Sequence, residues 1–342
     1  MNILIVKLSA IGDVIHTLPA LAALRKLYPD ANITWVIEET SSDLITNHPH
    51  LDRVIVSRRK RWIDDFKHGR IVKPFNEMKS FVKELKSQSY DLVIDFHGLL
   101  KSAVVVFLSS GKRKLGYDSM QEMSGLFLNE KIPEDMDKHA VDRYLDFLRY
   151  LGAEVKEPEF FIPVQKENIN RIEGFLQTDG IDIKDRFVAV SPIALWDTKL
   201  WEDEKFARLC DRIAEELKVR VVFTGSDRRK LESIQSRMRF PAVNLGGETT
   251  LRDLAYLYRL SSLVITTDSG PMHIAAAVGT PVVALFGPTD PSRTGPYGMG
   301  HTVIRNDLSC SPCFQKKCNS MKCMLDITVE EVYYKVKEKL SG

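Results

Sequence analysis

The sequence lacks any apolar run long enough to cross a membrane. Its longest apolar stretches, residues 103–108 and 278–286, are far shorter than the roughly 20 residues that a transmembrane helix needs. Met1 leads directly into a strand-like run at 2–6, without the charged leader, apolar segment and cleavage site of a secretory signal. We therefore expect a cytoplasmic protein that is not transmembrane.

A strong net charge is also missing. The 48 Lys and Arg residues nearly balance the 46 Asp and Glu residues, which gives a net charge of +2. A general electrostatic affinity for nucleic acid or membranes is therefore not expected, and an anionic partner must meet a local basic patch. The chain also has no low-complexity segment and no short-period repeat.

What the chain does contain is a regular alternation of short apolar segments and helical patterns. Strands are predicted at 2–6, 33–37, 54–56, 92–94, 113–116, 187–190, 219–223, 263–266 and 281–286. Helices are predicted at 139–151, 204–217, 228–239, 251–259 and 273–278. This alternation predicts parallel α/β sheets. The 342 residues are enough for two such domains, with an acidic, proline-containing linker at 156–163.

The domain boundaries follow from this pattern. We expect Rossmann-like domains at 1–160 and 161–328, followed by a helical segment at 329–342. The sequence leaves open which domain that last helix packs against.

Two polar loops in the second half point to a ligand site. Residues 266–273 follow a predicted strand, Gly270 permits a tight turn, and Ser269 can cap the next helix. A helix N-terminus presents N–H groups that suit a diphosphate, although alone this segment is more typical of an ordinary capped helix. A second Gly/Pro-rich loop at 286–291 follows the next strand on the same edge, so the two loops together predict one site.

These motifs resemble glycosyltransferase family nine, the ADP-heptose heptosyltransferases. The similar segments are KLSAIGDVIHTLPAL at 7–21, DSGPMH at 268–273 and GTPVVALFGPTDP at 279–291. Three weaker segments, RRKRW at 58–62, DFHGLLKSA at 95–103 and HAVDR at 139–143, look like those of the members that add the first heptose to Kdo-bearing lipid A. The resemblance spans nearly the whole chain.

The resemblance implies a GT-B fold, in which two Rossmann-like domains with parallel sheets face each other across a cleft. The C-terminal domain would bind ADP-heptose, and the N-terminal domain would bind the anionic lipid acceptor at the cytoplasmic face of the inner membrane. It also implies inverting displacement with ADP as leaving group and no metal or other cofactor. The single Asp-x-Asp pair, Asp135 and Asp137, lies in a charged stretch rather than at a strand end, which agrees with metal independence.

Asp13 and Lys199 are the candidate catalytic residues. Asp13 lies in the first strand-to-helix turn, where a carboxylate can accept the proton of the acceptor hydroxyl and the helix N-terminus favours its charged form. Its structural alternative is a helix cap. Lys199, beside an aromatic residue in a strand-end loop, can stabilise the leaving diphosphate. Most lone lysines are simply solvated, so the resemblance carries much of this assignment.

The remaining site candidates divide between the two substrates. The donor candidates are Ser191, Lys199, Asp227, Thr249, Asp268, Ser269, Gly270 and His273. The acceptor candidates are Ser9, Gly12, Arg58, Arg59, Arg61, His97 and Lys101. Asp227 stands where the family often has a glutamate on the ribose hydroxyls, so its shorter side chain leaves that role open. A buried histidine with satisfied hydrogen bonds is the competing interpretation of His273.

The acceptor arginines belong to the one dense basic cluster of the sequence. It comprises Arg58, Arg59, Lys60 and Arg61, with Lys67, His68, Arg70 and Lys73 behind it. Such a run is usually a solvated face. Arginine forks nevertheless suit the carboxylates and phosphates of the expected acceptor, and we expect the neighbouring Trp62 and Phe66 to contact lipid or the membrane surface.

Four of the five cysteines, Cys310, Cys313, Cys318 and Cys323, lie within fourteen residues. In a cytosolic protein this spacing is compatible with a structural metal site. Because a second C-x-x-C is missing, free or redox-labile thiols are the favoured interpretation.

Other functions fit parts of the pattern. A later heptosyltransferase, adding the second heptose or beyond, would share the donor motifs. A sugar-nucleotide 2-epimerase of similar fold would need no basic acceptor patch and would turn over its donor without an acceptor. A nucleotide-binding regulatory protein would need neither Asp13 nor Lys199.

Overall fold

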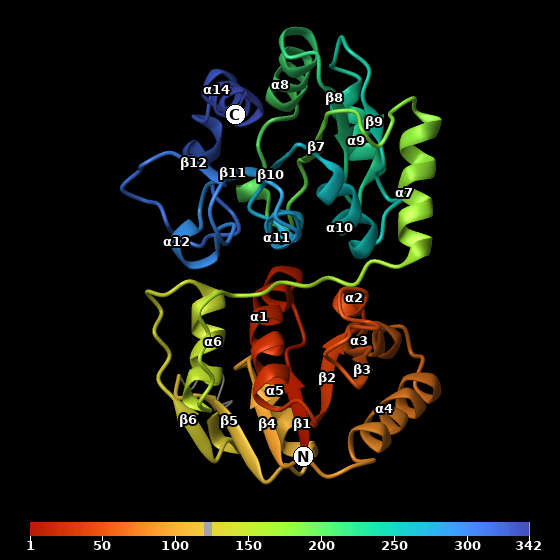
Figure 1. The fold of residues 1–342 in the computed structure, drawn as a ribbon, viewed down its shortest axis with the longest axis vertical. Helices are drawn as coiled ribbons and strands as arrows, with labels where there is room; N and C mark the ends of the chain where they lie inside the picture. Colours follow the sequence, from red (N-terminus) through yellow and green to blue (C-terminus); the bar gives the residue numbers. More distant parts are fainter. Residues whose placement is uncertain (120–124, 342) are drawn as a thin grey trace. The chain divides into compact units, whose positions relative to one another are not determined.

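The computed structural model describes residues 1–119 and 125–341, which divide into two compact units (Figure 1). The first unit is Met1–Pro163, and the second begins at Val164. Each contains a six-stranded sheet in which every described strand pairing is parallel. The expected α/β class with two Rossmann-like sheets is confirmed.

The sheet of the first unit has the order β3-β2-β1-β4-β5-β6. Its strands are β1 Asn2–Val6, β2 Asn32–Glu38, β3 Arg53–Ser57, β4 Leu92–Asp95, β5 Arg113–Tyr117 and β6 Glu130–Ile132. Its helices are α1 Ile11–Leu27, α2 Glu39–Ser42, α3 Arg59–Lys67, α4 Val72–Leu85, α5 Leu100–Leu108 and α6 Ala140–Tyr150. The strand order changes direction between the parallel neighbours β1 and β4: β2 and β3 are added on one side, and β4, β5 and β6 on the other. Such folds bind ligands at this switch point, at the carboxyl ends of the strands.

The sheet of the second unit repeats this order as β12-β11-β10-β7-β8-β9. Its strands are β7 Phe187–Ser191, β8 Arg220–Phe223, β9 Val243–Asn244, β10 Leu263–Thr267, β11 Val282–Phe286 and β12 Thr302–Arg305. Its helices are α7 Lys166–Thr178, α8 Asp203–Glu216, α9 Arg228–Gln235, α10 Leu251–Leu260, α11 Gly270–Ala277, α12 Pro291–Thr294, α13 Lys322–Leu325 and α14 Val329–Ser341. Here the reversal falls between β7 and β10.

The central strands are apolar along their whole length because helices cover both faces of each sheet. Residues 3–6 of β1 and 263–265 of β10 are completely buried. At the strand ends the sequence changes to polar residues such as Lys7, Ser191 and Asp268. The hydrophobic effect therefore fixes the strands, and their polar continuations lie together at one edge of each sheet.

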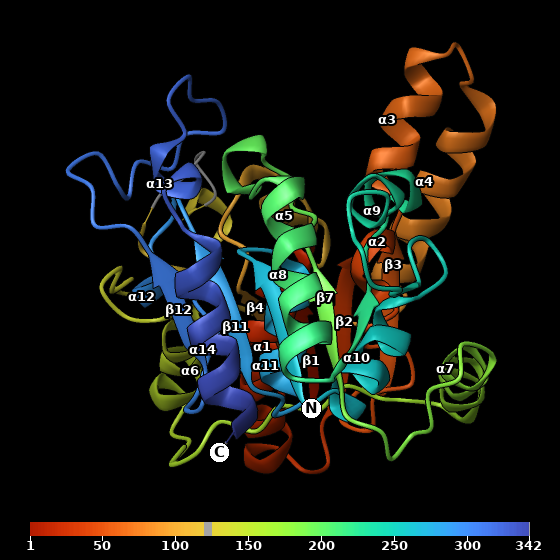
Figure 2. The same ribbon diagram turned by 90° about the horizontal axis from the view of Figure 1, so that it is seen from above.

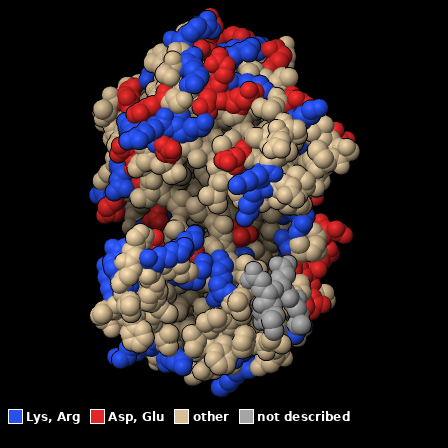
Figure 3. Space-filling view, turned by 180° about the vertical axis from the view of Figure 1, so that it is seen from behind, with Lys and Arg blue, Asp and Glu red and all other residues tan. Residues whose placement is uncertain are grey.

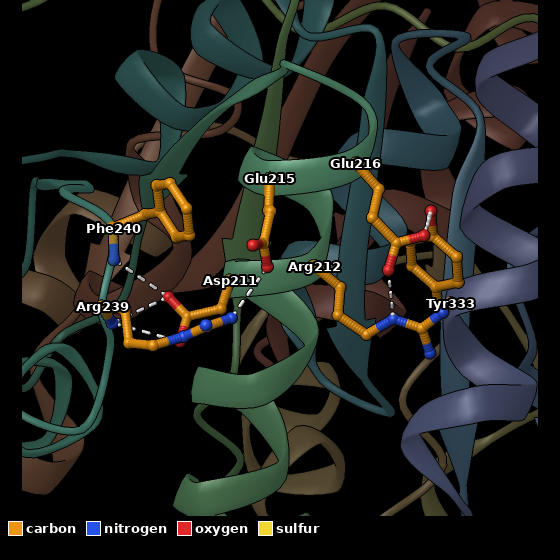
Figure 4. A network of polar contacts seen from close by, with 7 residues as sticks. All are labelled: Asp211, Arg212, Glu215, Glu216, Arg239, Phe240 and Tyr333. Atoms are coloured by element: carbon orange, nitrogen blue, oxygen red, sulfur yellow. Dashed lines mark hydrogen bonds and ion pairs between the residues drawn. The ribbon is translucent and has the colours of Figure 1, made fainter.

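The last helix, α14, packs on α8 of the second unit, which answers the question that the sequence left open (Figures 2 and 4). The hydroxyl of Tyr333 donates to Glu216 Oε2 at 2.7 Å, and the Arg212 guanidinium lies 3.8 Å from the Tyr333 ring centroid. Beside them, Asp211 of α8 accepts the backbone N–H of Arg239 at 2.8 Å. These contacts hold α14 and the segment after α9 against the same helix.

Several boundaries differ from the sequence prediction. The short strands β6, β9 and β12 were missed because they contain too few apolar residues to show a period. The helix predicted at 228–239 ends at Gln235, since the carboxylate of Asp211 takes the backbone N–H of Arg239. Helix α11 begins at Gly270 rather than at residue 273, because Pro271 fits the first turn, where no helical N–H bond is lost. Among the described residues, no helix combines the length and apolar character needed to cross a bilayer.

Candidate active sites of the two units

Asp13 lies at the switch point of the first unit, as the third residue of α1. Its Oδ2 accepts the backbone N–H of Ala10 at 3.0 Å, and its backbone carbonyl accepts the hydroxyl of Thr17 at 2.8 Å. Asp13 therefore does cap the start of the helix, although from within the first turn, because Ala10 occupies the N-cap position. The cap holds the half-buried carboxylate at the carboxyl end of β1.

A buried polar pair that the sequence did not reveal lies behind Asp13. Lys7 Nζ donates to the hydroxyl of Tyr144 at 2.5 Å and to the carbonyl of Phe96 at 3.0 Å. Tyr144 in turn hydrogen-bonds Asp13, and burial together with this carboxylate raises the pKa of Tyr144. Burial lowers the pKa of Lys7, while the charges of Asp13 and Asp95 oppose that shift. The chain from Lys7 through Tyr144 thus fixes one side of Asp13.

The turn after β4 places His97 and Lys101 at the same edge. Asp95 accepts the backbone N–H groups of His97 and Gly98 at 2.9 and 3.2 Å, and Lys101 Nζ donates to Ser9 Oγ at 2.7 Å. Burial, followed by the charge of Lys7, lowers the pKa of His97 to about 3. Both of its ring nitrogens are buried without a hydrogen-bond partner in the described part of the chain, so a neutral imidazole is present beside the acceptor candidates.

The structure thus brings most of the predicted acceptor residues together. Ser9, Gly12 and Asp13 follow β1, and His97 and Lys101 follow β4. These residues lie together because β1 and β4 are neighbours in the sheet, and local sequence patterns do not reveal the strand order.

The predicted basic cluster is partly neutralised by carboxylates. The pairs are Arg58 with Glu39 at 2.9 Å, Arg59 with Glu38 at 3.1 Å and Arg61 with Glu77 at 3.6 Å. Glu38 is only 2% exposed and also lies 3.8 Å from Lys101 Nζ. Glu38 therefore links Arg59 to the switch point, a role that the sequence analysis missed because the residue ends a strand without any motif.

Lys199 lies at the switch point of the second unit. It ends a short 3₁₀ helix, Asp197–Lys199, in the loop after β7. Its Nζ is 2.5 Å from Asp268 Oδ2 and 4.4 Å from the ring centroid of Trp196. The hydroxyl of Thr289 donates to the same carboxylate oxygen at 2.5 Å. Lys199, Asp268 and Thr289 thus connect the ends of β7, β10 and β11, and Trp196 and Thr289 are additions to the predicted set.

Four further donor candidates lie on β7 and at the start of α11, near the contact between Lys199 and Asp268. Ser191 ends β7, is completely buried, and is paired in register with Thr266 of β10. The expectation that Ser269 caps α11 with its side chain is wrong: it occupies the N-cap position, but its hydroxyl makes no cap bond and lies 3.3 Å from Thr266 Oγ1. Gly270 is the first residue of α11, and His273 lies buried within that helix.

Asp227 and Thr249 lie farther along the same edge, after β8 and β9. Asp227 is the N-cap of α9 and accepts the backbone N–H of Lys230 at 3.1 Å, so it has a structural role of its own. The two loops adjoin, since the backbone N–H of Gly247 donates to the carbonyl of Gly225 at 2.8 Å. A Cβ atom at Gly246 would lie 2.8 Å from the Arg228 Cα, which only glycine avoids.

The four clustered cysteines are free thiols in the structure. Cys310 and Cys318 are exposed, Cys313 is half-buried and Cys323 is buried. Burial raises the pKa of Cys323, and the other three thiols add to that shift. Within residues 1–119 and 125–341, no three His, Cys, Asp or Glu side chains are arranged to hold a metal ion.

Comparison with known proteins identifies the relatives of this chain. The sequence model described as glycosyltransferase family 9 (heptosyltransferase) matches residues 78–324. The lipopolysaccharide heptosyltransferase 1 of Escherichia coli O18:K1:H7 is 28% identical over 339 residues, covering 97% of this chain and 99% of that protein. The lipopolysaccharide core heptosyltransferase OpsX of Haemophilus influenzae is 26% identical over 309 residues, covering 89% of this chain and 84% of that protein.

Solved structures show the same similarity. A family 9 glycosyltransferase from Veillonella parvula has a TM-score of 0.86 and 25% identity, covering 99% of this chain and 97% of its own. The E. coli heptosyltransferase WaaC with ADP has a TM-score of 0.78 and 25% identity, with coverage of 99% and 100%. These relatives confirm the GT-B fold class. A UDP-GlcNAc 2-epimerase from Methanocaldococcus jannaschii, with a TM-score of 0.51 and 13% identity, shares the fold alone.

Proposed function

Since the chain belongs to glycosyltransferase family 9, we propose that it transfers L-glycero-D-manno-heptose from ADP-heptose to Kdo-bearing lipid A. It is a glycosyltransferase, and its curated relatives are lipopolysaccharide heptosyltransferases, which places it in lipopolysaccharide core synthesis. ADP-heptose as donor is supported by the E. coli relatives solved with ADP and with ADP-2-deoxy-2-fluoro heptose. The observation that carries the proposal is the cluster around Asp13 at the first switch point.

In this proposal the first unit binds the acceptor and Asp13 is the general base. An inverting displacement needs one carboxylate that removes the proton of the acceptor hydroxyl as the new bond forms. The Ala10 N–H and the Tyr144 hydroxyl both hydrogen-bond the Asp13 carboxylate and hold it at the end of β1. The turns after β1 and β4 position the acceptor sugar through Ser9, Gly12, His97 and Lys101.

The second unit then binds the donor. As the bond between heptose and ADP breaks, negative charge grows on the diphosphate, and Lys199 together with the start of α11 would stabilise it. Asp268 holds the lysine in place before the diphosphate arrives, while Ser191, Ser269, Gly270 and His273 shape the surrounding surface. Asp227 and Thr249 are proposed to contact the nucleoside from the neighbouring loops. This arrangement uses a lysine and helix N–H groups, so we propose a reaction without metal.

The acceptor assignment rests on the basic cluster. Arg58, Arg59 and Arg61 offer forked donors for the Kdo carboxylates and lipid A phosphates, with Glu38, Glu39 and Glu77 holding them in place until the acceptor displaces those contacts. A lipid acceptor would bring the enzyme to the cytoplasmic face of the inner membrane as a peripheral protein. No nucleic acid partner is proposed.

The test is release of ADP from ADP-L-glycero-D-manno-heptose in the presence of EDTA, with and without Kdo-bearing lipid A. We expect release only with acceptor, and a loss of about 10²- to 10⁴-fold in Asp13→Asn. Release without acceptor would identify an epimerase or hydrolase instead. Loss of activity with EDTA that added metal restores would disprove metal independence.

A later heptosyltransferase is the second candidate. It is favoured by the 26% identity over 287 residues to the lipopolysaccharide heptosyltransferase 3 of E. coli K12, covering 82% of this chain and 80% of that protein. Activity only with an already heptosylated acceptor would select this alternative and retain the donor assignment.

A further inference from the structure

Helices α3 and α4 stand side by side as a hairpin, residues 58–85, that extends from the first unit (Figure 2). We define its tip as residues 66–75. The tip exposes large apolar side chains: Phe66 is 40%, Ile71 64%, Val72 75% and Phe75 62% exposed. A cluster of exposed apolar side chains at the end of a projecting element marks an interaction surface rather than a structural need.

The side chains between the two helices of the hairpin already contact one another. Trp62, which the sequence suggested as a lipid contact, is 7% exposed; its Nε1–H donates to Glu77 Oε2 at 2.8 Å, and its ring lies edge-on to Phe81 at 5.7 Å. That expectation is therefore wrong, because Trp62 joins the two helices. Phe66, the second residue of that expectation, does lie at the exposed tip, so the apolar tip is free to contact something outside the unit.

The charge of the hairpin indicates what that partner is. Residues 58–85 contain nine Lys and Arg but only four Asp and Glu, whereas the whole chain has a net charge of +2. Lys67, Arg70 and Lys73 are exposed within the tip itself, and Figure 3 shows Lys and Arg side chains bordering uncharged surface on the first unit. A second copy of this positive hairpin would be repelled. Mixed apolar and basic side chains fit the surface of an anionic lipid bilayer.

We propose that the hairpin tip docks the enzyme on an anionic phospholipid bilayer. Phe66, Ile71, Val72 and Phe75 enter the headgroup region, and Lys67 and Lys73 pair with lipid phosphates. Arg70 is already paired with Asp65 of α3 at 2.8 Å, so the two lysines supply the lipid contacts. The reason for docking rests on the proposed function, since a lipid-borne acceptor lies in that surface. Docking itself is a binding property that can be measured without any catalysis.

The test is cosedimentation of the full chain with vesicles of phosphatidylethanolamine and phosphatidylglycerol, compared with phosphatidylcholine vesicles. We expect binding to the anionic vesicles, and a loss of about tenfold or more in the triple variant Ile71→Asn, Val72→Asn, Phe75→Asn. Lys67→Gln with Lys73→Gln should weaken binding and reduce its salt dependence. Ile183→Asn with Met299→Asn, which removes exposed apolar side chains of the second unit, is the matched control and should bind like wild type.

Three results would overturn the proposal: no binding by wild type, wild-type binding by the triple variant, or an oligomer that the triple variant abolishes, which would make the tip a contact between copies. ADP release with acceptor in detergent micelles separates docking from catalysis. There the triple variant should equal wild type, whereas with acceptor in vesicles its rate should fall. If no acceptor supports release but vesicle binding persists, the proposed function fails and the docking surface stands.

Discussion

Replacing Lys199 by methionine tests the proposed donor site most directly. The substitution keeps most of the side-chain volume over Trp196 and removes the charge that lies 2.5 Å from Asp268. If this lysine stabilises the leaving diphosphate, its loss should lower kcat by about 10²- to 10³-fold, the usual effect of removing one such group, which is about 3–4 kcal/mol.

The same substitution also affects folding, so it needs a matched control. Asp268 is 6% exposed, and leaving a buried carboxylate unpaired costs about 3–5 kcal/mol. We expect the lower end, because the hydroxyl of Thr289 still donates to it. The double variant Lys199→Met, Asp268→Asn removes the stranded charge and should recover most of the free energy of unfolding without recovering kcat.

Two measurements decide the outcome: urea unfolding for stability and ADP release at saturating donor for kcat. A kcat that recovers together with stability in the double variant would refute the proposed catalytic role of Lys199, because it would show that the lysine only holds the loop together.

Three further predictions concern stability and reactivity. Burial lowers the pKa of His48 to about 4 from 6.5. The contribution of the neutral His48 to the free energy of unfolding is therefore full above pH 6.5 and falls by about 3 kcal/mol toward pH 4. Urea unfolding of His48→Gln should show a flatter pH dependence of this free energy, and an unchanged pH dependence would disprove the prediction. Ellman's reagent should modify the exposed Cys318, because a hydrogen bond from Ser320 lowers the pKa of its thiol. The buried Cys210 should react only after unfolding, and equal reaction rates of the two thiols would contradict this burial. Asp211→Ala removes the acceptor of the backbone N–H groups of Arg239 and Phe240, so it should lower the free energy of unfolding in urea by about 2–3 kcal/mol. Glu215→Ala, at the surface, should lower it by less than about 1 kcal/mol.

The basic cluster at 58–61 and the hairpin tip show where sequence reasoning was incomplete. RRKRW was recognised as a basic segment, but its arginines turned out to be paired with Glu38, Glu39 and Glu77, which lie up to 21 residues away along the chain. Trp62 looked like a lipid contact and instead joins two helices. Ile71 and Val72, which no motif marked, are among the most exposed apolar residues, because exposure depends on what the rest of the fold covers.

Local sequence patterns were enough to predict the alternation of strands and helices and the two similar halves, because burial on both faces of a parallel sheet requires continuous apolar runs. They also placed Asp13 and Lys199 at strand ends. The contacts that these two side chains make follow from the tertiary fold. Strand order brings Lys101 to Ser9 across 92 residues, and the packing of α6 on α1 brings Tyr144 to Lys7 across 137. Such contacts depend on which strands and helices become neighbours, and no local period of hydrophobicity records that choice.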